Sequence, residues 1–154
     1  MDTELLKQTA NFLVSPGRGI LAADESNGTM TKRLEGVGVS SSPESRNAYR
    51  ASLFAMPTMA DAISGVILYD ETIRQTAVDG TSIPDFLHGI VVLPGIKVDT
   101  GAKPLAGYEN ETVTEGLDGL RERCAEYFAM GARFAKWRAV IRIGDGLPSD
   151  ACIS

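Results

Sequence analysis

Histidine and cysteine are scarce in this sequence, which narrows the kinds of site that it can hold. It contains one histidine, His88, and two cysteines, Cys124 and Cys152. Two cysteines do not make a disulfide scaffold, and reduced thiols in a cytoplasm are the default. One histidine and two distant cysteines are also a poor set of zinc ligands, so we expect no metal site. His88 lies in a polar stretch and is predicted to be a surface or loop residue.

Long apolar runs and an excess of basic residues are missing as well. No stretch approaches the roughly 18 apolar residues that span a bilayer, and the polar N-terminus does not resemble a signal peptide. The net charge is −5, whereas nucleic-acid backbones are bound by an excess of Lys and Arg. We therefore expect a cytoplasmic protein with no membrane or nucleic-acid partner, in which any basic site is local.

The apolar residues predict alternating strands and helices in a single domain, residues 1–154. The composition, 44% hydrophobic and 23% charged, is that of one globular domain. Helices are predicted at residues 3–15, 29–37 and 43–56, the last capped by Ser42, and at 114–131. Short apolar runs that predict strands lie within residues 20–23, 64–72, 90–99 and 132–141. Antiparallel strands with one solvent-exposed face would show a more regular alternation of apolar and polar residues. The order of strands and helices therefore favours an α/β fold with a parallel sheet.

The helix predicted at residues 114–131 has one apolar and one acidic face. Its apolar stripe consists of Leu117, Leu120, Cys124, Tyr127 and Phe128. We expect the acids of the other face to be solvated: Asp118, Glu122 and Glu126.

Polar residues gather where the predicted strands end. They are Asp24 and Glu25, Asp70 and Glu71, Lys97 and Asp99, and Lys136 and Arg138. In parallel α/β folds the carboxyl edge of the sheet is where sites are built. Cations and acids on one such edge suit a phosphorylated or carbonyl substrate, because Arg grips anions in a fork and Lys supplies a point charge or a proton.

Lys136 and Arg138 pose a question of charge, because positions two apart on a strand face the same side. Such side chains are about 7 Å apart and repel by about 2 kcal/mol at an effective dielectric of 20. A nearby carboxylate, as in a structural ion pair, or an anionic ligand must offset this repulsion. Trp137 points the other way and is predicted to pack between the sheet and a covering helix.

The last residues, "GLPSDACIS", predict a helix that begins after Ser149 and stops after about one turn. A helix this short does not hold itself together in water. We therefore expect a truncated chain, with four strand units of the eight that a barrel of roughly 250 residues requires.

Several motifs resemble class I fructose-bisphosphate aldolase, the Schiff-base-forming glycolytic enzyme. They are "GILAADES", "SGVILYDET", "PGIKVD", "GLDGLRERC" and "GARFAKWRAVIRIG", and the likeness covers essentially the whole chain. The resemblance implies the N-terminal half of a (β/α)8 TIM barrel, about four β/α units. It implies reversible cleavage of fructose 1,6-bisphosphate to dihydroxyacetone phosphate and glyceraldehyde 3-phosphate, with no metal or cofactor. It also implies a homo-oligomer, since relatives are commonly tetramers.

The resemblance also assigns expected roles to individual residues. Asp24 matches the aspartate that contacts the reacting hydroxyls and assists proton transfer, and Lys97 and Lys136 match lysines of the active centre. Arg138 matches a cation near one substrate phosphate. The group that handles the other phosphate, and a further substrate-associated arginine, correspond to Ser26, Thr29, Lys32, Arg33 and Arg46. The family's imine-forming lysine lies on the sixth strand and its proton-transferring glutamates on the fifth, so this chain alone is expected to be inactive.

Other interpretations remain open at this point. The chain can be a non-catalytic half-barrel module that binds sugar phosphates or pairs with a partner chain, since a sheet cut from a barrel has two open edges. It can also be an unrelated phosphate-binding α/β protein. Asp24 alone can simply cap the helix that follows it. Lys97 or Lys136 can in principle attack a carbonyl, although their family counterparts do not.

Overall fold

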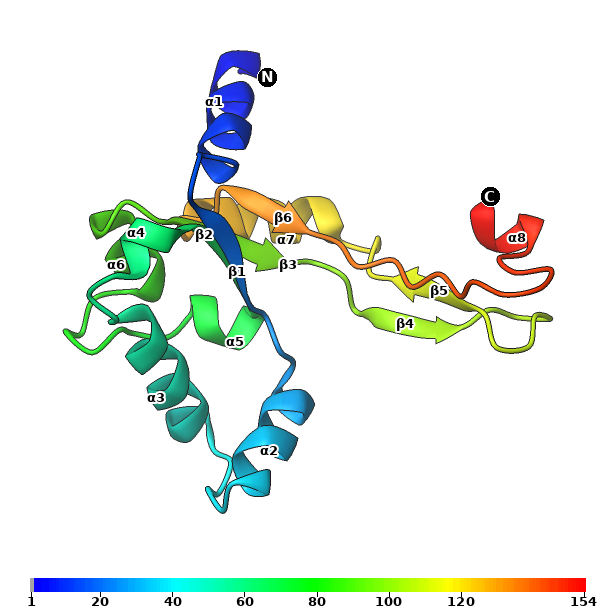
Figure 1. Cartoon of the computed structure of the whole chain (residues 1–154), viewed down its shortest axis with the longest axis horizontal. Helices are drawn as coiled ribbons and strands as arrows, with labels where there is room; N and C mark the ends of the chain where they lie inside the picture. Colours follow the sequence, from blue (N-terminus) through cyan, green and yellow to red (C-terminus); the bar gives the residue numbers. More distant parts are fainter. Residues whose placement is uncertain (1) are drawn as a thin grey trace.

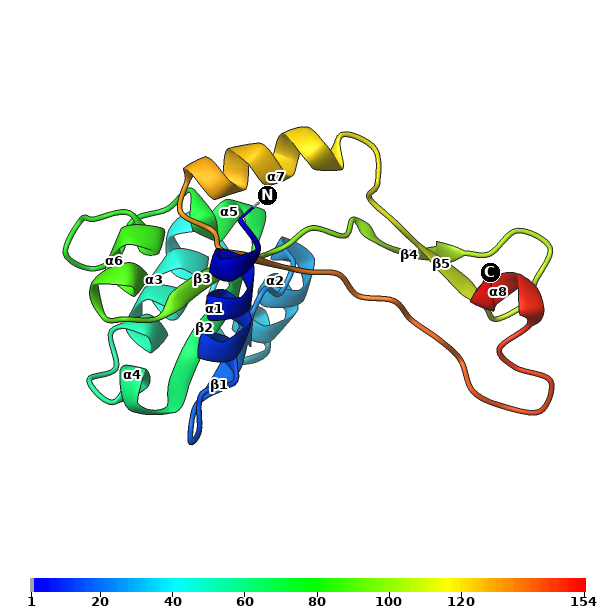
Figure 2. The ribbon, with the colours of Figure 1, turned by 90° about the horizontal axis from the view of Figure 1, so that it is seen from above.

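The computed structural model describes residues 2–154, which form an α/β body and an arm that projects from it (Figure 1). Figure 2 shows the same arm from above. No helix in the described residues is both long and apolar enough to cross a membrane. The elements in chain order are α1 Thr3–Leu13, β1 Gly19–Ala23, α2 Asn27–Gly36, α3 Pro43–Phe54, α4 Met59–Ala62, β2 Ile63–Leu68, α5 Asp70–Ile73, α6 Ile83–Gly89, β3 Leu93–Lys97, β4 Gly101–Pro104, β5 Thr112–Glu115, α7 Leu120–Ala129, β6 Phe134–Lys136 and α8 Asp150–Ile153.

Four strands form a parallel sheet in the order β1-β2-β3-β6, which confirms the parallel sheet expected from the sequence. Each strand after the first pairs with the one before it in this order, and the segments between strands contain the helices. Parallel strands need such crossover connections. Ser42 caps α3 as expected, since its hydroxyl accepts a hydrogen bond from the Ser45 amide at 3.1 Å.

One face of the sheet is buried under helices. Val66 and Leu68 of β2 and Ile96 of β3 are at most 2% exposed, and they pack with residues of α3 to α7 such as Phe54 and Leu87. Burial of this kind stabilises a fold by about 1.5–3 kcal/mol for each large aliphatic side chain. The hydrophobic core therefore lies between the sheet and these helices.

The opposite face of the sheet carries small residues next to a large one. Side chains that alternate with the buried set belong to this face, and Gly95 of β3 pairs there with Phe134 of β6. A Cβ atom on Gly95 would collide with the Phe134 ring, and one on Gly65 would lie 2.6 Å from Leu13 Cδ2. Glycine is therefore needed at both positions, and the Phe134 ring fills this part of the face below the strand ends.

The fourth strand is shorter than the sequence predicts. It ends at Lys136, so Trp137 and Arg138 lie in the segment that leaves the sheet. Trp137 does not pack under a covering helix; it is 37% exposed and lines a smaller hollow with residues of β5 and α8, including Thr112 and Cys152. The prediction for Trp137 is wrong because the strand ends one residue before it, beyond the reach of the helices on the sheet.

The arm consists of the antiparallel pair β4 and β5 and of the chain from 137 to 154, which runs beside it (Figures 1 and 2). Thr114 Oγ1 donates to the Arg138 carbonyl at 2.8 Å, and the Ser149 amide donates to Glu111 Oε1 at 2.9 Å. These bonds fasten the segment after β6 to the hairpin. The hairpin was not predicted from the sequence.

Two further expectations about helices need correction. Leu117 precedes α7 and is 72% exposed, because the helix begins after Gly119, whose φ of 62° is left-handed. Phe128 is also exposed and lies against the Arg133 guanidinium, so Tyr127 is the buried residue of α7. His88 is a half-buried residue of α6 rather than a surface or loop residue, and its Nε2 donates to the Gly131 carbonyl at 2.9 Å.

Candidate active site

The register of the sheet brings the ends of three strands to one level. Lys97 and Lys136, the last residues of β3 and β6, are direct partners. Asp24 follows the last residue of β1, which is paired with Leu68 of β2, and Leu68 is paired with the residue before Lys97. Since side chains alternate along a strand, all three polar residues belong to the face opposite the buried Leu68. The fold thus places one acid and two cations together at the carboxyl edge.

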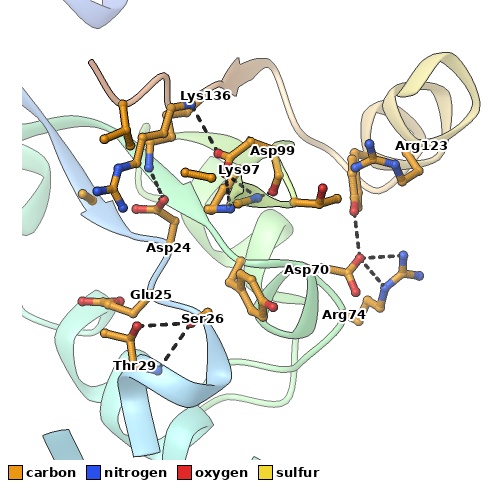
Figure 3. A pocket seen from close by; sticks show the side chains of 18 of the residues that line it. Asp24, Glu25, Ser26, Thr29, Asp70, Arg74, Lys97, Asp99, Arg123 and Lys136 are labelled. Carbon is orange, nitrogen blue, oxygen red and sulfur yellow. Dashed lines mark hydrogen bonds and ion pairs between the residues drawn. The ribbon is translucent and has the colours of Figure 1, made fainter. Parts of the chain in front are cut away.

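An open cavity of about 820 Å³ lies at this edge (Figure 3). It is bounded by the ends of β1, β2 and β3, by the start of α2, by α7 and by the segment after β6. Among the residues predicted for the site, the cavity is lined by Asp24, Ser26, Thr29, Arg33, Lys97, Lys136 and Arg138. Residues from four separate parts of the sequence therefore share one hollow.

Two carboxylates offset the charges of the two lysines. Lys136 Nζ donates to Asp24 Oδ2 at 2.5 Å, and Lys97 Nζ donates to Asp99 Oδ1 at 2.7 Å. Of the two cations whose repulsion was expected, Lys136 is balanced by Asp24, and Lys97 on the neighbouring strand is balanced by Asp99 (Figure 3). Arg138 is exposed and takes part in no ion pair among residues 2–154. Its guanidinium is therefore available to an anion.

Asp99 connects the strand that carries Lys97 to the segment that carries Arg138. Its Oδ1 also accepts from the Gly101 amide, and its Oδ2 accepts from the Arg138 amide at 3.3 Å. Burial raises the pKa of this carboxyl, but the hydrogen bond and charge of Lys97, the Arg138 amide and the charge of Lys136 outweigh burial. The net result is a pKa below the usual aspartate value.

We predict that Asp99→Asn removes stability only above acidic pH. A carboxyl whose pKa is lowered by folding contributes stability above its unfolded pKa of about 3.9, and this contribution is lost as the pH falls through the folded value. Urea titrations of wild type and Asp99→Asn should differ by about 1–3 kcal/mol in the free energy of unfolding at pH 7 and converge near pH 2. A difference of equal size at both pH values would show that the Asp99 charge contributes nothing.

The amino end of α2 forms a second, anion-suited part of the cavity. Ser26 is the N-cap and accepts a hydrogen bond from the Thr29 amide at 3.4 Å, while the two hydroxyls lie 3.2 Å apart. The free amides and the dipole at a helix start favour negative charge. Arg33, one turn further on, pairs with Glu25. Ser26 caps the helix, whereas Asp24, the other candidate cap, is held by Lys136.

Lys32 and Arg46 do not line the cavity. Lys32 is exposed on α2. Arg46 is buried and makes two bonds to the carboxylate of Glu71, at 2.8 and 2.6 Å. The hydrogen bond from Arg46 is the main reason why the pKa of Glu71 lies below its ordinary value. The structure thus separates these two cations from the other residues predicted for the site.

A second wall of the cavity was predicted only in part, since Asp70 was expected at the carboxyl edge but its partners were not. Asp70 accepts from the Tyr127 hydroxyl at 2.9 Å and from Arg74, which also pairs with Glu126 at 2.7 Å. Burial, together with the bond to Asp70, raises the pKa of Tyr127. Glu126 is therefore part of an ion-pair network at the cavity rather than of a freely solvated face. The strand-end position of Asp70 and its i, i+4 spacing from Arg74 were the local signals for this network.

Comparisons with known proteins show which family the chain belongs to. The family model of class I fructose-bisphosphate aldolase, the glycolytic form, matches residues 4–154. The chain belongs to the class I fructose-bisphosphate aldolase family. The aldolase-like α/β fold with a parallel sheet is supported by a solved structure of fructose-bisphosphate aldolase from Plasmodium falciparum, with a TM-score of 0.93 and 45% identity over 97% of this chain and 44% of that one.

Two curated aldolases show how much of the family this chain represents. A probable class 1 fructose-bisphosphate aldolase of Xanthomonas campestris is 54% identical over 99% of this chain and 46% of its own length. The cytosolic fructose-bisphosphate aldolase 6 of Arabidopsis thaliana is 51% identical over 97% and 42%. An aldolase named for the chloroplast, from Pisum sativum, is also among the relatives. The chain thus spans about half the length of the curated relatives it matches.

Proposed function

We propose that residues 1–154 are a single domain, the N-terminal half of a (β/α)8 barrel, in a protein that reversibly cleaves fructose 1,6-bisphosphate. The products are dihydroxyacetone phosphate and glyceraldehyde 3-phosphate. The observation that carries the proposal is the convergence of Asp24, Lys97 and Lys136 on one cavity that has anion-suited groups at its sides. The match to class I aldolase over residues 4–154 supports the same reaction.

Asp24 is the group that we assign to proton transfer. Cleavage of the carbon–carbon bond requires removal of a proton from a substrate hydroxyl, and a carboxylate within hydrogen-bond reach can accept it. Lys136, at 2.5 Å, fixes the carboxylate and stabilises its charge. Lys97 supplies a second positive charge near the reacting carbons, where negative charge develops during cleavage.

The two phosphates are assigned to opposite sides of the cavity. Arg138, which has no carboxylate partner among the described residues, binds one of them. The other is bound at the start of α2 by Ser26, Thr29 and Arg33, with Lys32 contributing charge from the helix surface. We assign Arg46 an indirect role, since its contact is Glu71 and not the cavity.

The carbanion left by cleavage needs an electron sink, which an imine on a lysine supplies without a metal or cofactor. Lys97 and Lys136 are unsuited to form it, because each ammonium donates to a carboxylate and has no lone pair with which to attack a carbonyl. We therefore propose that residues 1–154 alone form no imine and do not cleave the substrate. For the whole protein we propose a cytoplasmic homo-oligomer that acts on fructose 1,6-bisphosphate and triose phosphates.

Borohydride trapping tests the proposed function. The chain alone, incubated with dihydroxyacetone phosphate and borohydride, should gain no mass. A chimera of residues 1–154 with the remaining sequence of the Xanthomonas relative should gain one adduct and cleave fructose 1,6-bisphosphate. A stable adduct on a lysine of the chain alone would contradict the assignment of Lys97 and Lys136.

The open edges of the sheet favour a second candidate, a non-catalytic half-barrel that binds sugar phosphates or pairs with a partner chain. Among the described strands, β1 pairs only with β2 and β6 only with β3. Unpaired edges invite association. A folded chimera that binds fructose 1,6-bisphosphate but neither cleaves it nor forms an adduct would favour this candidate over the enzyme.

A further inference from the structure

Arg50 is a buried cation that the proposed chemistry does not use. Its side chain, on α3, is 0% exposed. Burial lowers the pKa of the guanidinium, and the charge of Glu25 opposes this effect only in part. Two of its nitrogens, Nε and Nη1, have no hydrogen-bond partner in the described residues. Arginine is almost never fully buried without full pairing, so this residue calls for an explanation.

The single nitrogen that is well bonded contacts the wall of the cavity from behind. Arg50 Nη2 donates to the Glu25 carbonyl oxygen at 2.5 Å and lies 3.5 Å from Glu25 Oε2. Glu25 stands in the turn from β1 to α2, between Asp24 and the cap residue Ser26. Its carboxylate also accepts from Arg33 Nη1. One arginine therefore touches the turn that carries three cavity residues (Figure 3 shows this turn).

Arg46, one helical turn before Arg50, reaches the same end of α2 by another route. It holds Glu71, and Glu71 Oε2 accepts from Asn27 Nδ2 at 3.1 Å. Asn27 is the first residue of α2. Side chains at i and i+4 lie on one face of a helix. The same face of α3 thus supports both the turn before α2 and the first residue of α2.

Stability alone does not account for Arg50. Replacing a buried ion pair by apolar groups of similar volume is often neutral or stabilising, because the desolvation of the charges is costly. Arg50 also leaves donors unsatisfied, which adds to that cost. What it provides instead is a fixed geometry for the Glu25 carbonyl, and hence for the residues on either side of it.

We propose that Arg50 is a positioning residue that acts through Glu25. It fixes the turn so that Asp24, the Ser26 cap and Arg33 are aimed into the cavity before substrate arrives. That the cavity binds a substrate phosphate rests on the proposed function, whereas the fixing of the turn rests only on the contacts of Arg50. Preorganised groups bind more tightly, because less ordering remains to be done on binding.

The test compares Arg50→Met and Arg50→Lys with Arg18→Met in the whole chain of 154 residues. Arg18 is a matched control, since it also donates to backbone carbonyls, of Ile63 at 2.8 Å and Val91 at 3.0 Å, but before β1, at the amino edge of the sheet. Calorimetry with fructose 1,6-bisphosphate gives the Kd. Hydrogen exchange without ligand measures how well the backbone amides of residues 25–29 are protected, and melting curves give the Tm.

Arg50→Met should raise the Kd for fructose 1,6-bisphosphate about tenfold. This is the change expected when the free energy of about one hydrogen bond that preorganises the turn is lost. Amides 25–29 should exchange faster in this variant, with the sheet amides unchanged, and Arg50→Lys should show a smaller change in the same places. Arg18→Met should leave the Kd and these amides unchanged even where it lowers the Tm.

Two results would overturn the proposal. One is that Arg50→Met has the same Kd as the wild type and the same exchange rates at amides 25–29. The other is Arg50 variants whose exchange rises uniformly over the chain, as for a residue that only stabilises the fold. If Arg50→Met does not fold, Arg50→Lys decides by the same two criteria. A wild-type chain that binds no fructose 1,6-bisphosphate counts against the proposed function instead, and the exchange data then decide the role of Arg50 in the turn.

Discussion

Asp24→Asn is expected to lower kcat by about 1,000-fold in the chimera with the Xanthomonas relative, within the range that general acid–base catalysis contributes. Asparagine keeps the shape of the side chain and can still accept a hydrogen bond from Lys136, but it cannot take a proton from a substrate hydroxyl. Steady-state assays of fructose 1,6-bisphosphate cleavage, discontinuous or coupled, measure kcat. Binding of the substrate should change much less than turnover, because the lost function belongs to the transition state.

The control for Asp24→Asn is the same substitution at Asp70. Asp70 also lines the cavity, but its partners are Tyr127 and Arg74 and it is assigned no proton transfer. We expect less than about threefold loss of kcat for Asp70→Asn, since it touches no reacting atom. The Tm of both variants should change by only a few degrees. Matched losses of activity and stability in Asp24→Asn would make Asp24 a structural residue.

Arg138→Ala is expected to raise KM for fructose 1,6-bisphosphate by about 10- to 100-fold, because it removes a charged hydrogen-bond donor to a substrate phosphate. The backbone of Arg138 is held independently of its side chain, by the Asp99 carboxylate and by Thr114 Oγ1. Alanine therefore removes the guanidinium without releasing the segment. A contact with a phosphate far from the reacting carbons acts equally on ground and transition states, so kcat should change little.

The companion variant for Arg138→Ala is Arg142→Ala. Arg142 is an exposed arginine of the same segment that does not line the cavity. Steady-state kinetics in 50 and 200 mM salt should show a raised KM for Arg138→Ala alone. An unchanged KM for Arg138→Ala, or an equal rise in both variants, would remove Arg138 from phosphate binding and leave only a general effect of charge.

The sequence predicted the carboxyl edge of the sheet well because that edge follows from local pattern. Short apolar runs that end in charged residues identify strands and their ends, and parallel pairing then brings the ends together. This is how Asp24, Lys97 and Lys136 could be grouped before any coordinates. What the pattern does not contain is the register, which decides that Lys136 reaches Asp24 while Lys97 pairs with Asp99.

The features that were missed depend on tertiary contacts. Arg50 was not singled out from the sequence, and Arg46 was expected at the substrate rather than on Glu71. Both lie on a helix whose charged residues would normally be solvated, and only the docking of α3 behind the start of α2 buries them. The arm was missed for a related reason, since β4 and β5 are four residues each and are mostly polar or exposed. The end of β6 at Lys136 is likewise set by where the chain turns toward the hairpin, which local propensity does not encode.

The pairing of Asp24 with Lys136 joins positions 112 apart along the chain. During synthesis on a ribosome the aspartate emerges first, and it does not meet Lys136 until β6 has been made and has docked on β3. Distant contacts of this kind are made late, because the loop they close is long. The carboxylate that we assign to catalysis therefore gains its lysine partner only when β6 joins β3, so this ion pair reports the arrival of that strand.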